Sequence, residues 1–189
     1  FSDVYGNPHA FHSFGQEASR AVFEAKRAIG SAIGADYKEV VFTGSATEAN
    51  NLAIRGVLRA FREQRLAFSK NHPKATLYPN RYTLNPRIIT STFEHESVLE
   101  TCRDLEKEGV EVIYIPVSRE GLVDLEKLKA ALNERTVLVS IMHANNETGT
   151  IQPIEKISEI IRNFRASKRA MSHPEEKPKD LVLAPTRRC

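Results

Sequence analysis

The stretch Thr136-Val-Leu-Val-Ser-Ile-Met142 is nearly all apolar and runs directly into the polar segment His143-Ala-Asn-Asn-Glu-Thr-Gly149. A short apolar run of this kind is typical of a strand buried on both faces, as in parallel sheets. In open parallel sheets, ligands bind beyond the carboxyl ends of the strands. The amide, carboxylate and imidazole groups after this strand therefore predict either a turn that satisfies its own polar groups or contacts to a polar ligand.

Strands and helices are expected to alternate along the rest of the chain. Further strands are predicted at 39–43, 87–91 and 110–115. Apolar residues at helical spacing predict helices at 15–33, 47–61, 96–108 and 124–132, and another that starts at Pro153. Gly34 and Gly109 are expected to end two of these helices, and Asp124 to cap one. This order predicts an α/β fold, with a mostly parallel, doubly wound sheet and flanking helices.

Two segments depart from the alternating pattern. Residues 62–87 are rich in Pro, Asn and basic side chains, and we expect them to form an inserted surface loop. Residues 166–189 are polar and unpatterned, which predicts a basic tail and suggests a frameshift or split gene near Ala166. Residues 1–165 are then one partial domain. Because the chain opens on Phe1 without an initiator Met, we expect it to be a fragment whose start is missing.

The composition, with 189 residues of which 41% are hydrophobic and 27% charged, is that of an average soluble globular protein. No run approaches the ~20 apolar residues of a membrane span, and no basic-then-apolar leader opens the chain. A membrane protein is therefore not expected. Two cysteines are too few for a disulfide framework or a metal cluster, which favours a cytoplasmic location and predicts no metal site.

The net charge of +3 hides an uneven distribution. The expected loop and residues 162–189 are basic, whereas the rest of the chain has thirteen basic and twenty acidic residues. Neither basic segment interleaves aromatic side chains with Gly in a recognised pattern, and Tyr78 and Tyr82 are the candidates for base stacking. The sequence therefore does not favour nucleic-acid binding.

The segment Gly44-Ser-Ala-Thr47 follows an expected strand and opens an expected helix. Free backbone N–H groups, the positive end of the helix dipole and two hydroxyls converge there, which predicts an anion site of phosphate size. The segment lacks the Lys of a Walker P-loop and any Gly-x-Gly-x-x-Gly pattern, so neither a nucleoside triphosphate nor a dinucleotide is favoured. The alternative is a capped helix start that binds no ligand.

His95 ends the segment Thr92-Phe-Glu-His95, which follows the strand expected at 87–91. A neutral imidazole at the start of a helix can stack on a flat ring or move a proton near neutral pH. The alternative is a histidine that only caps the helix or packs against its neighbours. Cys102 falls on the apolar face of the helix that follows and is predicted to be a core residue rather than a nucleophile.

Four stretches together resemble the cysteine desulfurases of the NifS/IscS type, in the class V group of pyridoxal-phosphate aminotransferase folds. They appear in the family's order and cover residues 6 to about 161. The stretches are Gly6-Asn-Pro8 with His12 and Gly15, Val41-Phe-Thr-Gly-Ser-Ala-Thr-Glu-Ala-Asn-Asn-Leu-Ala-Ile54, Ile88-Ile-Thr-Ser91 with Glu94-His95 and Val98-Leu99, and Val139-Ser-Ile-Met-His-Ala-Asn-Asn-Glu-Thr-Gly149. The resemblance implies part of the large domain of an aspartate aminotransferase-like, pyridoxal-phosphate-dependent transferase.

Carried over position by position, the resemblance implies a set of cofactor-binding residues. Ala46 and Thr47 would hold the phosphate of pyridoxal 5′-phosphate, in agreement with the anion site expected there. His95 would stack on the pyridine ring and assist proton transfer, which makes it the catalytic residue of the set. Asn146 would hydrogen-bond the phenolic oxygen of the ring.

The resemblance also implies an activity. Sulfur would be removed from L-cysteine, which leaves alanine and an enzyme persulfide for iron–sulfur cluster assembly or thiolation. It further implies a homodimer and a scaffold protein that accepts the sulfur. We expect no membrane partner.

The sequence departs from the family where the remaining catalytic residues would lie. In the family a Lys holds the cofactor covalently, an Asp pairs with the pyridinium nitrogen and a mobile Cys attacks the substrate sulfur. No Ser-Gly-His-Lys-like segment is present here, and Cys189 ends the unpatterned tail, so it is not assigned as the nucleophile. We therefore expect the chain to be inactive by itself.

Two alternatives stay open at the level of the sequence. One is another class V enzyme, such as a selenocysteine lyase or an aminotransferase that acts on a different amino acid. The other is a non-catalytic binding module whose basic loop and tail contact RNA or an acidic partner.

Overall fold

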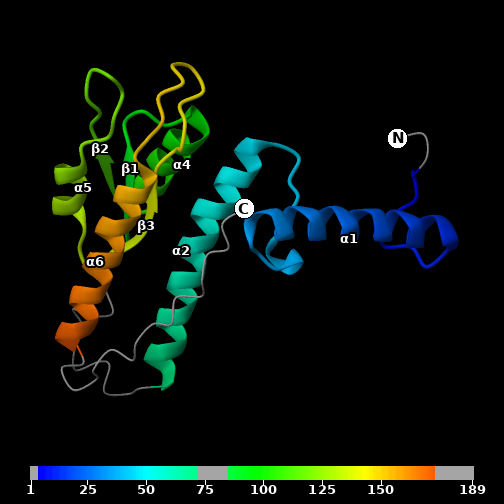
Figure 1. The fold of residues 1–189 in the computed structure, drawn as a ribbon. Coiled ribbons are helices and arrows are strands. Elements are labelled where there is room, and N and C mark those ends of the chain that lie inside the picture. Colours follow the sequence, from blue (N-terminus) through cyan, green and yellow to red (C-terminus); the bar gives the residue numbers. More distant parts are fainter. Residues whose placement is uncertain (1–3, 72–84, 173–189) are drawn as a thin grey trace. The chain divides into compact units, whose positions relative to one another are not determined.

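The computed structural model describes residues 4–71 and 85–172 (Figure 1). Contacts between residues divide the chain into two compact units, residues 1–49 and 50–189. The division falls inside helix α2 (Ala46–Asn71). Each unit is described here by itself.

The first unit is built around helix α1 (Ser13–Ile33). The side chain of His12 caps its start, where Nδ1 accepts a hydrogen bond from the Gly15 N–H at 3.2 Å. Gly34 ends the helix with φ of +71°, a left-handed conformation that glycine adopts without steric cost. The helix predicted over 15–33 and its glycine cap are both confirmed.

The strand predicted at 39–43 is wrong. Tyr37–Glu39 form the short 3-10 helix η1, which Asp36 caps through its bond to the Lys38 N–H at 2.8 Å. Residues 40–43 belong to no sheet. A β-branched and aromatic run becomes a strand only where another strand pairs with it, and all three strands of the described chain belong to the second unit.

The second unit contains a three-stranded parallel sheet with the strand order β2-β1-β3. Its strands are β1 (Arg87–Ser91), β2 (Glu111–Ile115) and β3 (Thr136–Ser140). Ile89 of the central strand pairs with Ile113 on one side and with Val139 on the other. The predicted parallel α/β architecture is confirmed.

Alternate residues of the central strand face two different layers of helices. Ile88 packs into a cluster with residues of α2 and α4 (Glu96–Lys107). Ile89 packs into a second cluster with residues of α5 (Leu125–Ala131) and α6 (Ile154–Ser172). Figure 1 shows α5 and α6 on one side of the sheet and α4 and α2 on the other. Because successive side chains of a strand point to opposite faces of the sheet, the central strand contributes to both apolar clusters.

Strand β3 differs from its prediction in both length and burial. It ends at Ser140 instead of Met142, and all five of its residues are half-buried instead of fully buried. Within the described chain β3 lies at an edge of the sheet, with β1 as its one neighbour. An edge strand has neighbouring side chains on one side only, which leaves it partly exposed.

Two helices run further than the sequence pattern predicts. Helix α2 continues to Asn71 and α6 to Ser172, so the first residues of the expected loop and of the expected tail are helical. Both extensions consist mainly of good helix formers such as Arg, Gln, Leu, Ala and Lys. Residues 72–84 and 173–189, which make up most of the predicted loop and tail, lie outside the described residues.

The predicted bounds of α4 and α5 and the predicted start of α6 are confirmed to within two residues. Asp124 caps α5 by accepting a hydrogen bond from the Lys127 N–H at 3.0 Å. Gly109 follows the end of α4 with φ of +85°. Pro153 directly precedes α6, and its carbonyl accepts from the Ile157 N–H at 3.1 Å. No helix among the described residues is long and apolar enough to cross a membrane.

Candidate functional site

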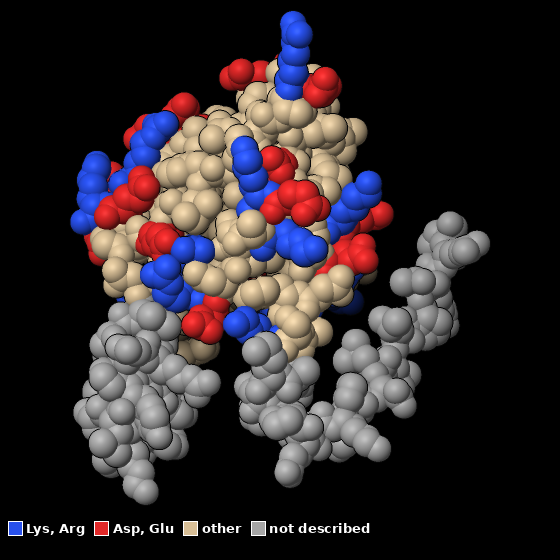
Figure 2. Space-filling model, turned by 90° about the vertical axis from the view of Figure 1, so that its left-hand side faces the viewer, with Lys and Arg blue, Asp and Glu red and all other residues tan. Residues whose placement is uncertain are grey.

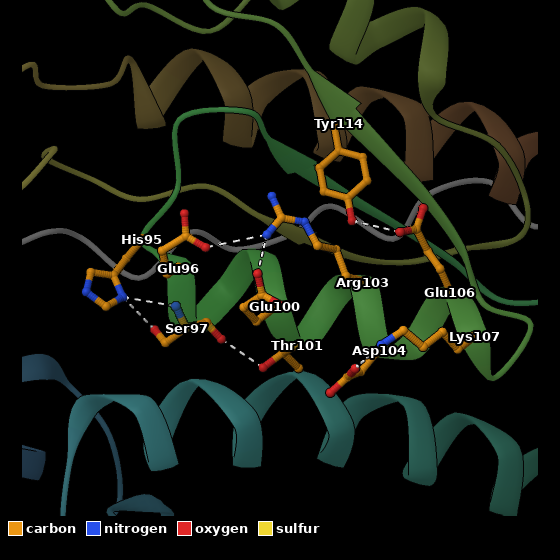
Figure 3. Close-up of polar contacts among 10 residues, drawn as sticks. All are labelled: His95, Glu96, Ser97, Glu100, Thr101, Arg103, Asp104, Glu106, Lys107 and Tyr114. Carbon is orange, nitrogen blue, oxygen red and sulfur yellow. Dashed lines mark hydrogen bonds and ion pairs between the residues drawn. The ribbon is translucent and has the colours of Figure 1, made fainter.

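The loop after β1 carries His95 to the start of α4. The side-chain Nδ1 of His95 accepts a hydrogen bond from the Ser97 N–H at 3.1 Å and lies 2.9 Å from Ser97 Oγ (Figure 3). Because Nδ1 is an acceptor, the neutral ring carries its proton on Nε2. The side chain is exposed, so the ring is oriented by the cap while remaining accessible.

Helix α2 supports this cap from the other side of Ser97. The Asn50 side chain donates to Ser97 Oγ at 2.8 Å, and Ser97 itself is 8% exposed. One turn further along α4, Thr101 Oγ1 donates to the Ser97 carbonyl at 2.8 Å. The capping interpretation of His95 is therefore confirmed, and capping leaves its ring available for a second role.

The loop after β3 is organised around Asn145, which is 7% exposed. Its Oδ1 accepts hydrogen bonds from the N–H groups of Glu147 and Thr148, both at 2.9 Å. Its Nδ2 donates to the Phe93 carbonyl at 3.2 Å. The next residue, Asn146, is exposed. Asn145 therefore hydrogen-bonds within its own turn, which is the first of the two interpretations of this polar segment. Asn146 is exposed to solvent, as the second interpretation, contact with a polar ligand, requires.

The loops after β1 and β3 are bonded to each other. Glu94 Oε1 accepts from the Met142 N–H at 2.8 Å and from Ser91 Oγ at 3.0 Å. Burial raises the pKa of the Glu94 carboxyl, although both hydrogen bonds oppose that shift. The sequence pattern gave Glu94 no role of its own. The signal in the sequence that could have indicated this role is a carboxylate in the loop after a buried strand.

The loop after β2 joins the same edge of the sheet. The Gln152 side chain, 3% exposed, donates to the Gly121 carbonyl at 2.6 Å and accepts from the Val123 N–H at 2.9 Å. Thr150 Oγ1 donates to the Glu120 carbonyl at 3.1 Å. These contacts, which the sequence did not predict, bond the loop after β3 to the loop after β2.

In the first unit, the start of α2 is capped from within. Ser45 Oγ accepts from the Glu48 N–H at 3.1 Å, and the Glu48 carboxylate accepts from the Gly44 N–H at 2.7 Å. The first intrahelical bond of α2 runs from the Ala49 N–H to the Ser45 carbonyl at 3.1 Å. Ser45 therefore caps this helix start.

Ala46 and Thr47 lie in the first turn of α2 and are exposed. They belong to the N-terminal turn of the helix, where the helix dipole is positive. Amide donors, a threonine hydroxyl and the positive end of the helix dipole suit a phosphate group. At the same helix start the Glu48 carboxylate accepts from the Gly44 N–H.

Cys102 is completely buried in the core between α4 and the sheet. Burial raises the pKa of its thiol to about 11. The thiolate is the nucleophilic form of cysteine, and it is scarcely populated at neutral pH for such a group. The prediction that Cys102 is a core residue is confirmed.

The opposite, amino edge of the sheet is occupied by structural ion pairs. Arg87 Nη2 lies 2.5 Å from Glu111 Oε1, and Arg135 Nη2 lies 2.6 Å from Glu111 Oε2. The hydrogen bond from Arg87 lowers the pKa of the Glu111 carboxyl. Arg87 Nη1 also donates to the Ala131 carbonyl at 2.6 Å. These charges join β1, β2 and the end of α5.

The described surface mixes charges of both signs. Lys and Arg side chains lie next to Asp and Glu side chains on the face shown in Figure 2. Several basic residues of the second unit are ion-paired, including Lys127 with Asp124 at 3.7 Å and Lys168 with Glu134 at 3.6 Å. A mixed face of this kind does not have the one-sided positive charge of a nucleic-acid surface.

The fold and the three strand-end loops define an α/β protein with a ligand edge at the carboxyl ends of its parallel strands. The family model described as aminotransferase class-V matches residues 1–80 and 75–168, and the chain belongs to this family. Members of the family depend on pyridoxal phosphate.

Several proteins that are similar to this chain are named as cysteine desulfurases. The cysteine desulfurase IscS of Rickettsia africae is 44% identical over 163 residues, which cover 86% of this chain and 35% of that protein. Among solved structures, a NifS-like protein has a TM-score of 0.71 at 35% identity and covers 85% of this chain and 39% of its own. SspA in complex with cysteine has a TM-score of 0.68 at 35% identity, covering 87% and 42%. The resemblance to cysteine desulfurases is confirmed, and the chain spans about a third of the length of the curated relatives.

Proposed function

We propose that this chain forms the part of a cysteine desulfurase that binds the phosphate and the ring of pyridoxal 5′-phosphate. The observation that carries the proposal is the exposed pair His95 and Asn146, held on two loops that hydrogen bonds join at one edge of the sheet. Ala46 and Thr47 bind the phosphate through the first turn of α2.

Each of these residues performs a distinct task in the proposal. The helix N-terminus binds the phosphate dianion by its amide donors and its dipole. The bond from the Ser97 N–H to Nδ1 orients the His95 ring, so that one face stacks on the pyridine and Nε2 holds or moves a proton. The Asn146 amide donates to the phenolic oxygen. When bound, pyridoxal phosphate supplies a conjugated ring that acts as an electron sink.

The proposed reaction of the whole protein is the removal of sulfur from L-cysteine. The carbon–sulfur bond breaks, the sulfur passes to an enzyme cysteine as a persulfide, and the carbon takes up a proton to give alanine. This proposal is supported by the names of the similar proteins and by the relative solved with cysteine. The sulfur then passes to a scaffold protein for iron–sulfur cluster assembly or to a thiolation pathway.

The proposal extends to assembly and location. We expect the whole protein to act as a homodimer. A cysteine persulfide requires a compartment that keeps thiols reduced, so we place the activity in the cytoplasm.

The chain by itself is expected to release no sulfide from cysteine. Residues 6–161 contain no segment like that of the family's covalent Lys, and the one cysteine within them, Cys102, is buried. The chain should be incubated with pyridoxal phosphate and L-cysteine under reducing conditions. Sulfide release above a control with free cofactor would contradict this expectation.

The activity is tested in a chimera in which residues 6–161 of this chain replace the matched region of the Rickettsia africae relative. We expect sulfide release from L-cysteine, and a drop in kcat/KM of about a hundredfold on His95→Ala. Glu96→Ala is the matched control, because Glu96 is exposed and contacts only Arg103 on the same helix. A folded, cofactor-loaded chimera that acts on L-selenocysteine but not on L-cysteine would favour a selenocysteine lyase instead.

A further inference from the structure

We propose that Glu94 and Asn145 are positioning residues that set the distance between His95 and Asn146. The inference rests on the proposed function for the identity of the ligand, whereas the coupling of the two loops is a property of this chain alone. Each of the two residues directly precedes a proposed cofactor residue in the sequence. Each makes a hydrogen bond to the loop that carries the other cofactor residue.

Glu94 holds the loop after β3 from the side of β1. Its Oε1 accepts from the Met142 N–H at 2.8 Å, and these two residues are 48 positions apart. The same oxygen accepts from Ser91 Oγ at 3.0 Å, and Ser91, 1% exposed, also accepts from the Phe93 N–H at 3.1 Å. The carboxylate is thus bonded both to Ser91, at the end of β1, and to Met142. It therefore holds Met142 at a fixed position relative to β1.

Asn145 makes the reciprocal bond from the side of β3. Its Nδ2 donates to the Phe93 carbonyl at 3.2 Å, across 52 positions of sequence. Its Oδ1 is fully engaged with its own loop, where it accepts from the Glu147 and Thr148 N–H groups. Both ends of the amide are therefore used within the protein, which separates its role from that of the exposed Asn146.

Asn145 is 7% exposed and Glu94 is half-buried, so the loss of either hydrogen bond costs free energy. A buried polar group that loses its partner costs more free energy than an exposed one, because water cannot replace the partner. Burial raises the pKa of Glu94, which agrees with a carboxyl that is largely removed from water. The two bonds thus form a clamp, defined here as Glu94 to Met142 together with Asn145 to Phe93.

The clamp is tested first without any ligand, by amide hydrogen exchange of the full chain. In Glu94→Ala we expect the Met142 amide to exchange at least about tenfold faster than in the wild type, because it loses its acceptor. Glu94→Gln keeps an acceptor oxygen and should restore slow exchange. Glu96→Gln is the matched control and should leave it unchanged. Unchanged exchange at Met142 in Glu94→Ala would overturn the clamp.

Asn145→Asp provides a second variant that spares the turn. It keeps the acceptor for Glu147 and Thr148 but removes the donor to the Phe93 carbonyl. We expect faster exchange across residues 142–150 in a protein that remains folded. Exchange as slow as in the wild type would contradict the contribution of Asn145.

The second readout is binding of pyridoxine 5′-phosphate, which has no aldehyde and so forms no imine with surface lysines. Glu94→Ala and Asn145→Asp should weaken its binding about tenfold, while competition by inorganic phosphate stays unchanged, because only the ring contacts are disturbed. Wild-type affinity in both variants, with faster exchange, would overturn the positioning role but not the proposed function. If the wild-type chain does not bind the probe at all, the proposed function fails, and the exchange data still decide whether the clamp exists.

Discussion

At the scale of single residues, burial separates side chains that can react from side chains that only pack. His95 is exposed, with one ring nitrogen fixed by a backbone N–H. Cys102 is 0% exposed and packs in the cluster that contains Ile88 and Leu105. His95 caps α4 and Cys102 lies within it, so the position along this segment decides whether a reactive side chain reaches solvent or the core.

Cys102 is predicted to be inert in the folded protein. Its pKa of about 11 leaves very little thiolate at neutral pH, and its burial excludes reagents. Alkylation with iodoacetamide, followed by mass spectrometry of the peptide that contains Cys102, should show labelling only after denaturation. Rapid labelling of the native protein at this residue would contradict the described core.

Glu94 is predicted to make stability depend on pH. Its pKa is raised in the folded state, so the folded protein binds the proton more tightly than the unfolded chain. This stabilising effect is complete below the unfolded pKa and is lost as the pH rises through the folded pKa. The free energy of unfolding of the wild type relative to Glu94→Gln should therefore fall as the pH rises through that window. Denaturant unfolding at a series of pH values checks the trend, and a difference that increases with pH would contradict it.

At the scale of helices and strands, two apolar clusters stabilise the second unit on opposite faces of the sheet. Leu128 of α5 is 0% exposed in the cluster around Ile89, whereas Leu122, in the loop before α5, is 42% exposed. The same substitution at these two positions therefore separates core packing from surface effects.

Leu128→Ala is predicted to lower the free energy of unfolding by about 2–5 kcal/mol, because it removes buried methyl groups and leaves a cavity. Leu122→Ala is the control and should cost less than about 0.5 kcal/mol. Equilibrium unfolding in urea measures both. Equal losses in the two variants would show that α5 does not pack on the sheet as described.

The local sequence pattern predicts a helix or strand well where residues close to it in the sequence stabilise it. The residues of β1, the helix from Glu96 and the Asp124 cap follow from apolar spacing and capping chemistry. The expected strand at 39–43 fails because a strand needs a partner that its own sequence does not encode. The hydrogen bonds of Glu94 and Asn145 could not be predicted from the sequence either, because their partners lie about fifty positions away along the chain.

At the scale of the whole molecule, the proposed cofactor residues are distributed over the two compact units. Ala46 and Thr47 belong to the first unit, and His95 and Asn146 belong to the second. The sequence motifs identified all four residues through the family resemblance. The structure adds that the two in the second unit are exposed at the ends of adjacent parallel strands. The family resemblance predicts that all four residues respond to one ligand.

A titration of the isotope-labelled chain with pyridoxine 5′-phosphate, followed by two-dimensional NMR, tests this prediction most directly. We expect the backbone amides of Ala46, Thr47 and Asn146 and the imidazole of His95 to shift together and to reach saturation at the same ligand concentration. Inorganic phosphate should move Ala46 and Thr47 only, because it has no ring to contact the other two. If His95 and Asn146 do not shift, or if they reach saturation at a different concentration from Ala46 and Thr47, the account of a single cofactor site is contradicted.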